Sequence, residues 1–172
     1  KVRPSGRMPA MNLDDKKVQA LANYFLRGVH VNLQPNMTYQ YFEGSWDKLP
    51  DFSTLKPVAK GEAAAFDLHA GKRGNNFGMR FEGFLDVAKV GDYTFHLGSD
   101  DGSRLLIDGQ KVVDVDGMHP HTEPSGKTKL TAGPHPIQVD YFQGGGEWTL
   151  TLQFESKDLG RQEVAPFVTL TR

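Results

Sequence analysis

The sequence of 172 residues is long enough for one domain with an appendage, and its 38% hydrophobic content is enough to build a buried core. Its 20 basic and 21 acidic residues give a formal net charge of −1, so nothing in the charge favours nucleic acid or a membrane surface as a partner. No apolar run approaches the roughly 20 residues that cross a bilayer. The absence of cysteine excludes disulfides, thiolate metal sites and covalent haem attachment through Cys-x-x-Cys-His within the chain.

Residues 1–28 differ from the rest and predict one helix. Asp14 suits the N-cap position, and apolar side chains recur at helical spacing from Val18 to Phe25. Gly28 is a typical stop signal. We therefore expect a helix at about 15–27.

From Val29 onward the hydrophobic pattern changes to a period of two. Large apolar residues alternate with small or polar ones in segments 77–81, 93–97, 137–141 and 148–154. This alternation is typical of antiparallel strands with one buried and one wet face. The pattern predicts an all-β fold, an antiparallel β-sandwich or barrel, over residues 29–172.

Turn signals separate the predicted strands. Asp108-Gly109 stands between two apolar segments and predicts a hairpin with a two-residue turn. Segment 43–76 is less regular and predicts long loops, with one strand around Ala63–Leu68.

A series of short motifs runs between about Leu33 and Ser156. In order, these are Gly83-Phe84-Leu85, Gly91-Asp92-Tyr93-Thr94-Phe95, Ser99-Asp100-Asp101-Gly102-Ser103-Arg104-Leu105, Ile107-Asp108-Gly109, Leu130-Thr131-Ala132-Gly133-Pro134-His135-Pro136-Ile137 and Val139-Asp140-Tyr141-Phe142. Their order and spacing resemble the protective-antigen domain family of carbohydrate-binding modules, over about residues 29–157. The resemblance implies a β-sandwich module used outside the cytoplasm in adhesins, glycosidases, toxins and large bacterial surface proteins.

In several lectins of that family, two adjacent aspartates hold a calcium ion that contacts sugar hydroxyls, and Asp100-Asp101 occupy that position. Calcium takes six to eight oxygen ligands, which carboxylates and backbone carbonyls supply. Adjacent side chains of an extended chain point to opposite sides, so both carboxylates reach one ion if the peptide bond between them is cis, as it is in those relatives. The alternative is a plain turn, since Asp, Gly and Ser dominate turns.

A third carboxylate follows the predicted hairpin. Asp114 and Asp116 share one face if their segment is extended. Asp116 is the better candidate to ligate the ion with Asp100 and Asp101, because it lies at the entrance of a loop. For Asp114, a solvated strand face is the favoured interpretation.

Two loops supply the candidate ligand contacts. In the first loop, the candidates are Gly117 and His119. The pair His119-Pro120-His121 could bind a transition metal. Because the sequence offers no third ligand at a suitable spacing, an ordinary surface loop is the favoured interpretation. In the second, which runs from Gln143 to Trp148, the candidates are Gly145 and Glu147. Trp148 could stack on a sugar, but it begins an alternating segment, so core packing is favoured. For Trp46, both stacking on a sugar and core packing stay open.

Catalysis finds little support in the sequence. There is no Gly-x-Ser-x-Gly nucleophile motif and no phosphate-binding Gly-x-x-x-x-Gly-Lys motif. Asp100 and Asp116 could mimic the carboxylate pair of a glycosidase, but the sandwich family rarely uses them so. The chain is predicted not to be an enzyme.

The N-terminus carries a second resemblance. Gly6-Arg7-Met8-Pro9-Ala10, Leu13-Asp14-Asp15-Lys16-Lys17-Val18 and Ala20-Leu21-Ala22-Asn23-Tyr24 resemble the C-terminal end of a class I cytochrome c. Met8 matches the axial haem ligand of that family, yet the haem-attaching cysteines and histidine are absent. Residues 1–28 are therefore predicted to be the remnant of a cytochrome domain that precedes the module in a multidomain protein.

Together these features predict a non-catalytic, calcium-assisted carbohydrate-binding module of a larger bacterial protein, periplasmic, surface-bound or secreted, with a glycan or polysaccharide as partner. The alternative is a structural or protein-interaction scaffold attached to a cytochrome c. Electron transfer by this chain would require another chain to supply the missing part of the cytochrome.

Overall fold

The structure is a computed structural model that describes residues 34–171. The chain divides into two units between residues 33 and 34, and everything below concerns the second unit. The helix predicted at 15–27, like all of segment 1–28, lies outside the described residues.

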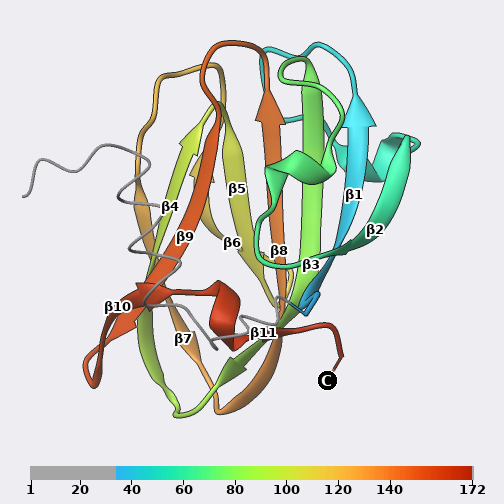
Figure 1. Cartoon of the computed structure of the whole chain (residues 1–172). Helices are drawn as coiled ribbons and strands as arrows, with labels where there is room; N and C mark the ends of the chain where they lie inside the picture. Colours follow the sequence, from blue (N-terminus) through green and yellow to red (C-terminus); the bar gives the residue numbers. More distant parts are fainter. Residues whose placement is uncertain (1–33, 172) are drawn as a thin grey trace, which may run out of the picture. The chain divides into compact units, whose positions relative to one another are not determined.

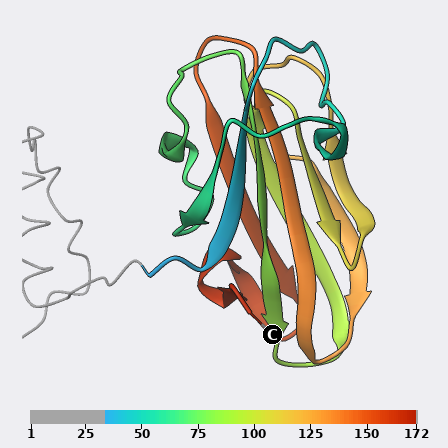
Figure 2. The ribbon, with the colours of Figure 1, turned by 90° about the vertical axis from the view of Figure 1, so that its right-hand side faces the viewer.

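Two antiparallel sheets face each other in this unit (Figures 1 and 2). The larger contains β1 (Met37–Glu43), β2 (Ala59–Ala63), β3 (Phe77–Val87), β5 (Ser103–Ile107), β6 (Gln110–Val115), β8 (Gly133–Gln143) and β11 (Val168–Thr169). The smaller contains β4 (Gly91–Asp100), β7 (Ser125–Leu130), β9 (Thr149–Ser156) and β10 (Leu159–Glu163). The larger sheet has the order β2-β1-β3-β8-β5-β6, with β11 paired to β3, and the smaller has the order β10-β9-β4-β7. The predicted all-β antiparallel fold is confirmed.

The core lies between the two sheets and follows the period of two. On β3, Phe77, Met79 and Phe81 are at most 1% exposed. From the smaller sheet, Phe95 and Leu97 of β4 are fully buried in the same cluster. Burying a side chain of this size contributes roughly 1.5–3 kcal/mol, so the interleaved aromatic and aliphatic rows hold the sheets together.

A second, smaller core covers part of the outer face of the larger sheet. It is built by the irregular segment after β1, which includes the 3₁₀ turn η1 (Phe52–Thr54). The ring of Phe52 stacks on Phe42 with 4.5 Å between centroids, and Trp46 meets Phe52 edge-on at 6.2 Å. Gly78 makes this approach possible, because a Cβ there would lie 2.5 Å from the Phe52 ring. Trp46 is therefore a packing residue.

The predicted hairpin is confirmed between β5 and β6. Asp108 and Gly109 both have positive φ, at 51° and 73°, as a type I′ turn requires. The strand predicted around Ala63–Leu68 is wrong: β2 ends at Ala63, and the 3₁₀ turn η2 (Leu68–Ala70) follows. Among the described strands, edge strand β2 pairs only with β1, so hydrogen bonding rather than apolar alternation defines it.

Candidate functional site

Three connections gather at the upper end of the sandwich in Figure 1. They are the β4–β5 turn at Asp100–Gly102, the β6–β7 loop at 116–124 and the β8–β9 loop at 144–148. Ser99 exchanges backbone hydrogen bonds of 3.0 and 3.1 Å with Thr122, so the β6–β7 loop is tied to the end of β4. The turn therefore lies between these two loops, and the second of them begins with three consecutive glycines, Gly144–Gly146.

Asp101 joins the turn to both loops. Its side chain is only 4% exposed, and the peptide bond between Asp100 and Asp101 is cis. The backbone N–H of His119 donates to Asp101 Oδ1 at 3.0 Å, and the N–H of Gly144 donates to Oδ2 at 2.9 Å. One carboxylate thus fixes a residue of each loop.

Two fully buried side chains support the turn from below. Gln143 Oε1 accepts the backbone N–H of Asp101 at 3.1 Å, while its Nε2 donates to the carbonyl of Glu147 at 3.1 Å. The Tyr141 hydroxyl lies 2.7 Å from Gln143 Oε1 and 2.5 Å from the carbonyl oxygen of Asp100. Tyr141 and Gln143 thus support the candidate site, a role that the sequence analysis assigned to neither residue; their place at the buried end of β8 was the available signal.

Burial raises the pKa of the Tyr141 phenol well above its usual range, and the nearby carboxylates of Asp101 and Asp100 raise it further. The phenol therefore stays a neutral hydrogen-bond donor.

We expect a pH effect from Tyr141. Because its pKa is higher in the folded than in the unfolded chain, its contribution to the unfolding free energy is complete below about pH 10 and is lost as pH rises through the folded-state value. Urea unfolding between pH 9 and 11.5 should show a steeper alkaline fall for the parent than for Tyr141→Phe. Equal slopes would contradict the role given to this phenol.

The carboxylate of Asp100 differs from that of Asp101. It makes no hydrogen bond or ion pair with any residue of the described unit, although its backbone pairs with Thr149 of β9. Each oxygen of a carboxylate can accept more than one contact, so Asp101 also keeps coordination capacity beside its two N–H donors. Two adjacent carboxylates offer the oxygen ligands that calcium prefers.

Asp116 is held by two backbone donors. Its Oδ1 accepts the backbone N–H of Leu49 at 2.6 Å and that of Gly117 at 2.7 Å, which ties the covering segment after β1 to this loop. Within residues 34–171, no group of three His, Cys, Asp or Glu side chains gathers closely enough to hold a metal ion. An ion at Asp100-Asp101 would therefore need backbone oxygens or water in its shell.

The histidines of the first loop act separately. His119 contributes its backbone N–H to Asp101, while its ring Nδ1 lies 2.9 Å from the Pro120 carbonyl. His121 Nδ1 lies 2.9 Å from Thr149 Oγ1. The two rings make different contacts, in line with the ordinary-loop interpretation.

The remaining predicted contacts lie in the two loops. Gly117 packs on the turn, since a Cβ on Gly102 would lie 3.0 Å from the Gly117 carbonyl oxygen. Gly145 has open space around its Cα, and the Glu147 side chain is exposed. Trp148 packs edge-on against Phe77 at 5.8 Å, so the core role predicted for it is confirmed.

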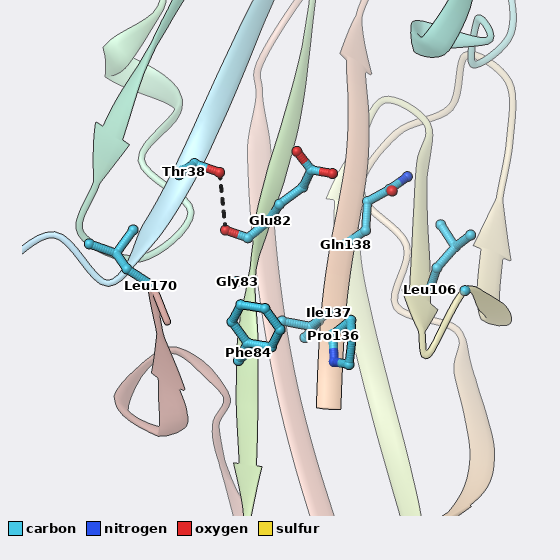
Figure 3. A pocket seen from close by; sticks show the side chains of 10 residues that line it. Thr38, Glu82, Gly83, Phe84, Leu106, Pro136, Ile137, Gln138 and Leu170 are labelled. Carbon is cyan, nitrogen blue, oxygen red and sulfur yellow. Dashed lines mark hydrogen bonds between the residues drawn. The ribbon is translucent and has the colours of Figure 1, made fainter. Parts of the chain in front are cut away.

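A separate hollow lies on the outer face of the larger sheet (Figure 3). Phe84, Pro136 and Leu106 give it an apolar lining, and the Glu82 carboxylate at its edge accepts a hydrogen bond from Gln40 at 3.1 Å. It lies on the sheet face rather than at the loop end, and it brings no pair of carboxylates together.

Fold and site together define a β-sandwich domain with an aspartate turn between two end loops. The model of the PA14 domain, which is the protective-antigen family, matches residues 65–166, and the chain belongs to this family. These comparisons give no support to the cytochrome c resemblance of residues 1–28.

Three relatives illustrate the likeness. The anti-sigma-I factor RsgI3 of Acetivibrio thermocellus is 28% identical over 137 residues, covering 76% of this chain and 21% of that protein. The PA14 domain of MpAFP antifreeze protein superposes with a TM-score of 0.67 at 16% identity, covering 79% of this chain and 90% of the other. The PA14 sugar-binding domain from an RTX adhesin gives 0.63 at 16% identity, covering 80% and 99%.

At these identities the solved structures establish the fold. The chain spans about a fifth of the curated relative that it matches. Within residues 34–171, no helix has the length and apolar character needed to cross a membrane.

Proposed function

We propose that this unit is a non-catalytic carbohydrate-binding module whose sugar site is the loop end around Asp100-Asp101. The observation that carries the proposal is that the carboxylates of the two aspartates have different roles. Asp101 positions both loops through its own carboxylate, and Asp100 leaves its carboxylate without a partner in the described unit. The likeness to the sugar-binding domain of an RTX adhesin supports the same function.

Calcium is the ion that this donor set would take. Asp100 and Asp101 would hold it, and carbonyl oxygens of the two loops and water would complete its shell. Asp116 stays a prediction as a third carboxylate, with its Oδ1 already bonded to Leu49 and Gly117. When bound, the ion would supply coordination positions for sugar hydroxyls.

The loops would set which glycan binds. Residues 117–126 and 143–147 flank the turn, and they include the candidate contacts Gly117, His119, Gly145 and Glu147. Affinity for a single sugar would be weak, and useful strength would come from several modules on one surface. Such a module would work outside the cytoplasm, as part of a larger bacterial protein.

Calcium binding should depend on Asp100. Calorimetric titration of chelator-stripped protein is expected to give a Kd on the order of 0.1–1 mM, as in extracellular modules. Calcium at ten times its Kd should raise the unfolding free energy by about 1.4 kcal/mol. Asp100→Asn should lose both effects, while its calcium-free stability stays within about 0.5 kcal/mol of the parent. No heat and no stabilisation in the parent at 10 mM calcium would overturn the metal proposal.

A second candidate is a structural or protein-interaction scaffold, which the match to a far longer anti-sigma factor favours. In that case the aspartate turn would serve the fold alone, and the partner would be another protein. The predicted cytochrome c neighbour belongs to this alternative. Calcium-dependent stabilisation with no response to any sugar would support the scaffold over the lectin-like module.

A further inference from the structure

The loop end carries one exposed apolar side chain. Met118 is 56% exposed, and Val58 and Val90 are the other large hydrophobic side chains exposed to this degree among residues 34–171. Met118 directly precedes His119, whose backbone N–H is fixed by Asp101. Its position beside the aspartate turn is thus set by a partly buried hydrogen bond.

The Met118 side chain reaches the second loop. A Cβ on Gly144 would lie 2.9 Å from Met118 Cε and 3.4 Å from its Sδ. The same Cβ would lie 3.4 Å from Asp101 Oδ2. The thioether therefore lies against the backbone of Gly144, next to the carboxylate that holds both loops.

The one large aromatic side chain of the two loops, Trp148, is half-buried and packs on the core cluster. Trp148 is packed against Phe77 and His69, with centroids 5.8 and 5.0 Å away. Apart from Met118 and Trp148, the residues of the two loops are Asp, Gly, Thr, Pro, His and Glu. A pyranose has an apolar C–H face as well as hydroxyls, and the aspartates can serve only the hydroxyls.

We propose that Met118 is the apolar contact for the C–H face of a bound pyranose, and that it thereby selects the ligand. This inference rests on the proposed carbohydrate function. A flexible, polarisable thioether adapts to an irregular apolar surface. The preferred ligand is then a terminal sugar ring that turns its hydroxyls toward Asp100-Asp101 and its C–H face toward Met118, rather than a polyanion.

Methyl NMR tests the contact directly. The full chain is labelled with ¹³C-methyl methionine and titrated, in calcium, with the glycan that gives the strongest signal on a glycan array. The Met118 methyl resonance should shift, while those of Met37 and Met79, which are 1% and 0% exposed, should stay in place. A Met118 resonance that does not move at saturating glycan would overturn the inference.

Affinity gives the second readout. Met118→Ala should weaken glycan binding roughly 10- to 20-fold, since contact with two methylene-sized groups is lost and each costs about fourfold. Met118→Leu should keep most of the affinity, and calcium affinity should not change. Val90→Ala is the matched control, an exposed apolar truncation before β4. Unchanged affinity in Met118→Ala would overturn this inference alone, whereas no binding by the parent to any glycan would overturn the proposed function with it.

Discussion

Asp101→Ala is expected to lower the unfolding free energy by about 2–4 kcal/mol. The substitution removes a carboxylate that is 4% exposed and accepts two backbone N–H groups, from His119 and Gly144. Hydrogen bonds to charged acceptors contribute roughly 1.5–3 kcal/mol each, and the orphaned donors recover only part of this from water. Urea denaturation without calcium measures the loss.

Asp100→Ala is the matched control, one residue away in the same turn. Its carboxylate has no partner in the described unit, so its removal should change the unfolding free energy by no more than about 0.5 kcal/mol. The pair separates the two roles, because both variants should lose calcium binding while only Asp101→Ala loses stability. Equal stability losses in the two variants would contradict this division.

Asp140→Ala is expected to cost more, about 3–5 kcal/mol, because it leaves a largely buried guanidinium without its partner carboxylate. Arg80 donates to Asp140 through Nε at 2.7 Å and through Nη2 at 2.9 Å. The two side chains are 15% and 4% exposed, so water cannot replace the lost partner well. Chemical denaturation of the variant measures the effect.

Two further variants test the reason for that loss. Replacing both partners, as in Arg80→Met with Asp140→Leu, should restore most of the stability, since no buried charge remains. Asp114→Ala should cost no more than about 1 kcal/mol, because Asp114 is 25% exposed where it pairs with Arg104 and Lys111. A loss for Asp114→Ala as large as that for Asp140→Ala would contradict the assignment of the effect to burial.

Local patterns predicted much of this fold. Alternation marked β4, β8 and β9, and the Asp108-Gly109 pair marked the hairpin, because side-chain period and turn chemistry are local properties. Edge strand β2 was misplaced because the sequence Ala59–Ala63 has no alternating apolar face. Its pairing with β1 depends on a neighbour that the pattern does not show.

The site was predicted only in outline. The resemblance pointed to Asp100-Asp101, and the structure places both between the two loops that were expected to shape specificity. The hydrogen bonds that hold Asp100 and Asp101 in place come from Tyr141 and Gln143, about 40 positions away in the sequence. These contacts depend on the register of the strands, which local sequence does not encode. The same holds for Asp116, whose partner Leu49 lies 67 residues earlier.

One comparison tests the central claim most directly: a glycan array probed with the parent chain and with Asp100→Asn, each in millimolar calcium and again in chelator. The account predicts binding to a small set of glycans by the parent in calcium, and loss of this binding both in chelator and in Asp100→Asn. A parent chain that binds no glycan in calcium, or an Asp100→Asn variant that binds equally well, would contradict it.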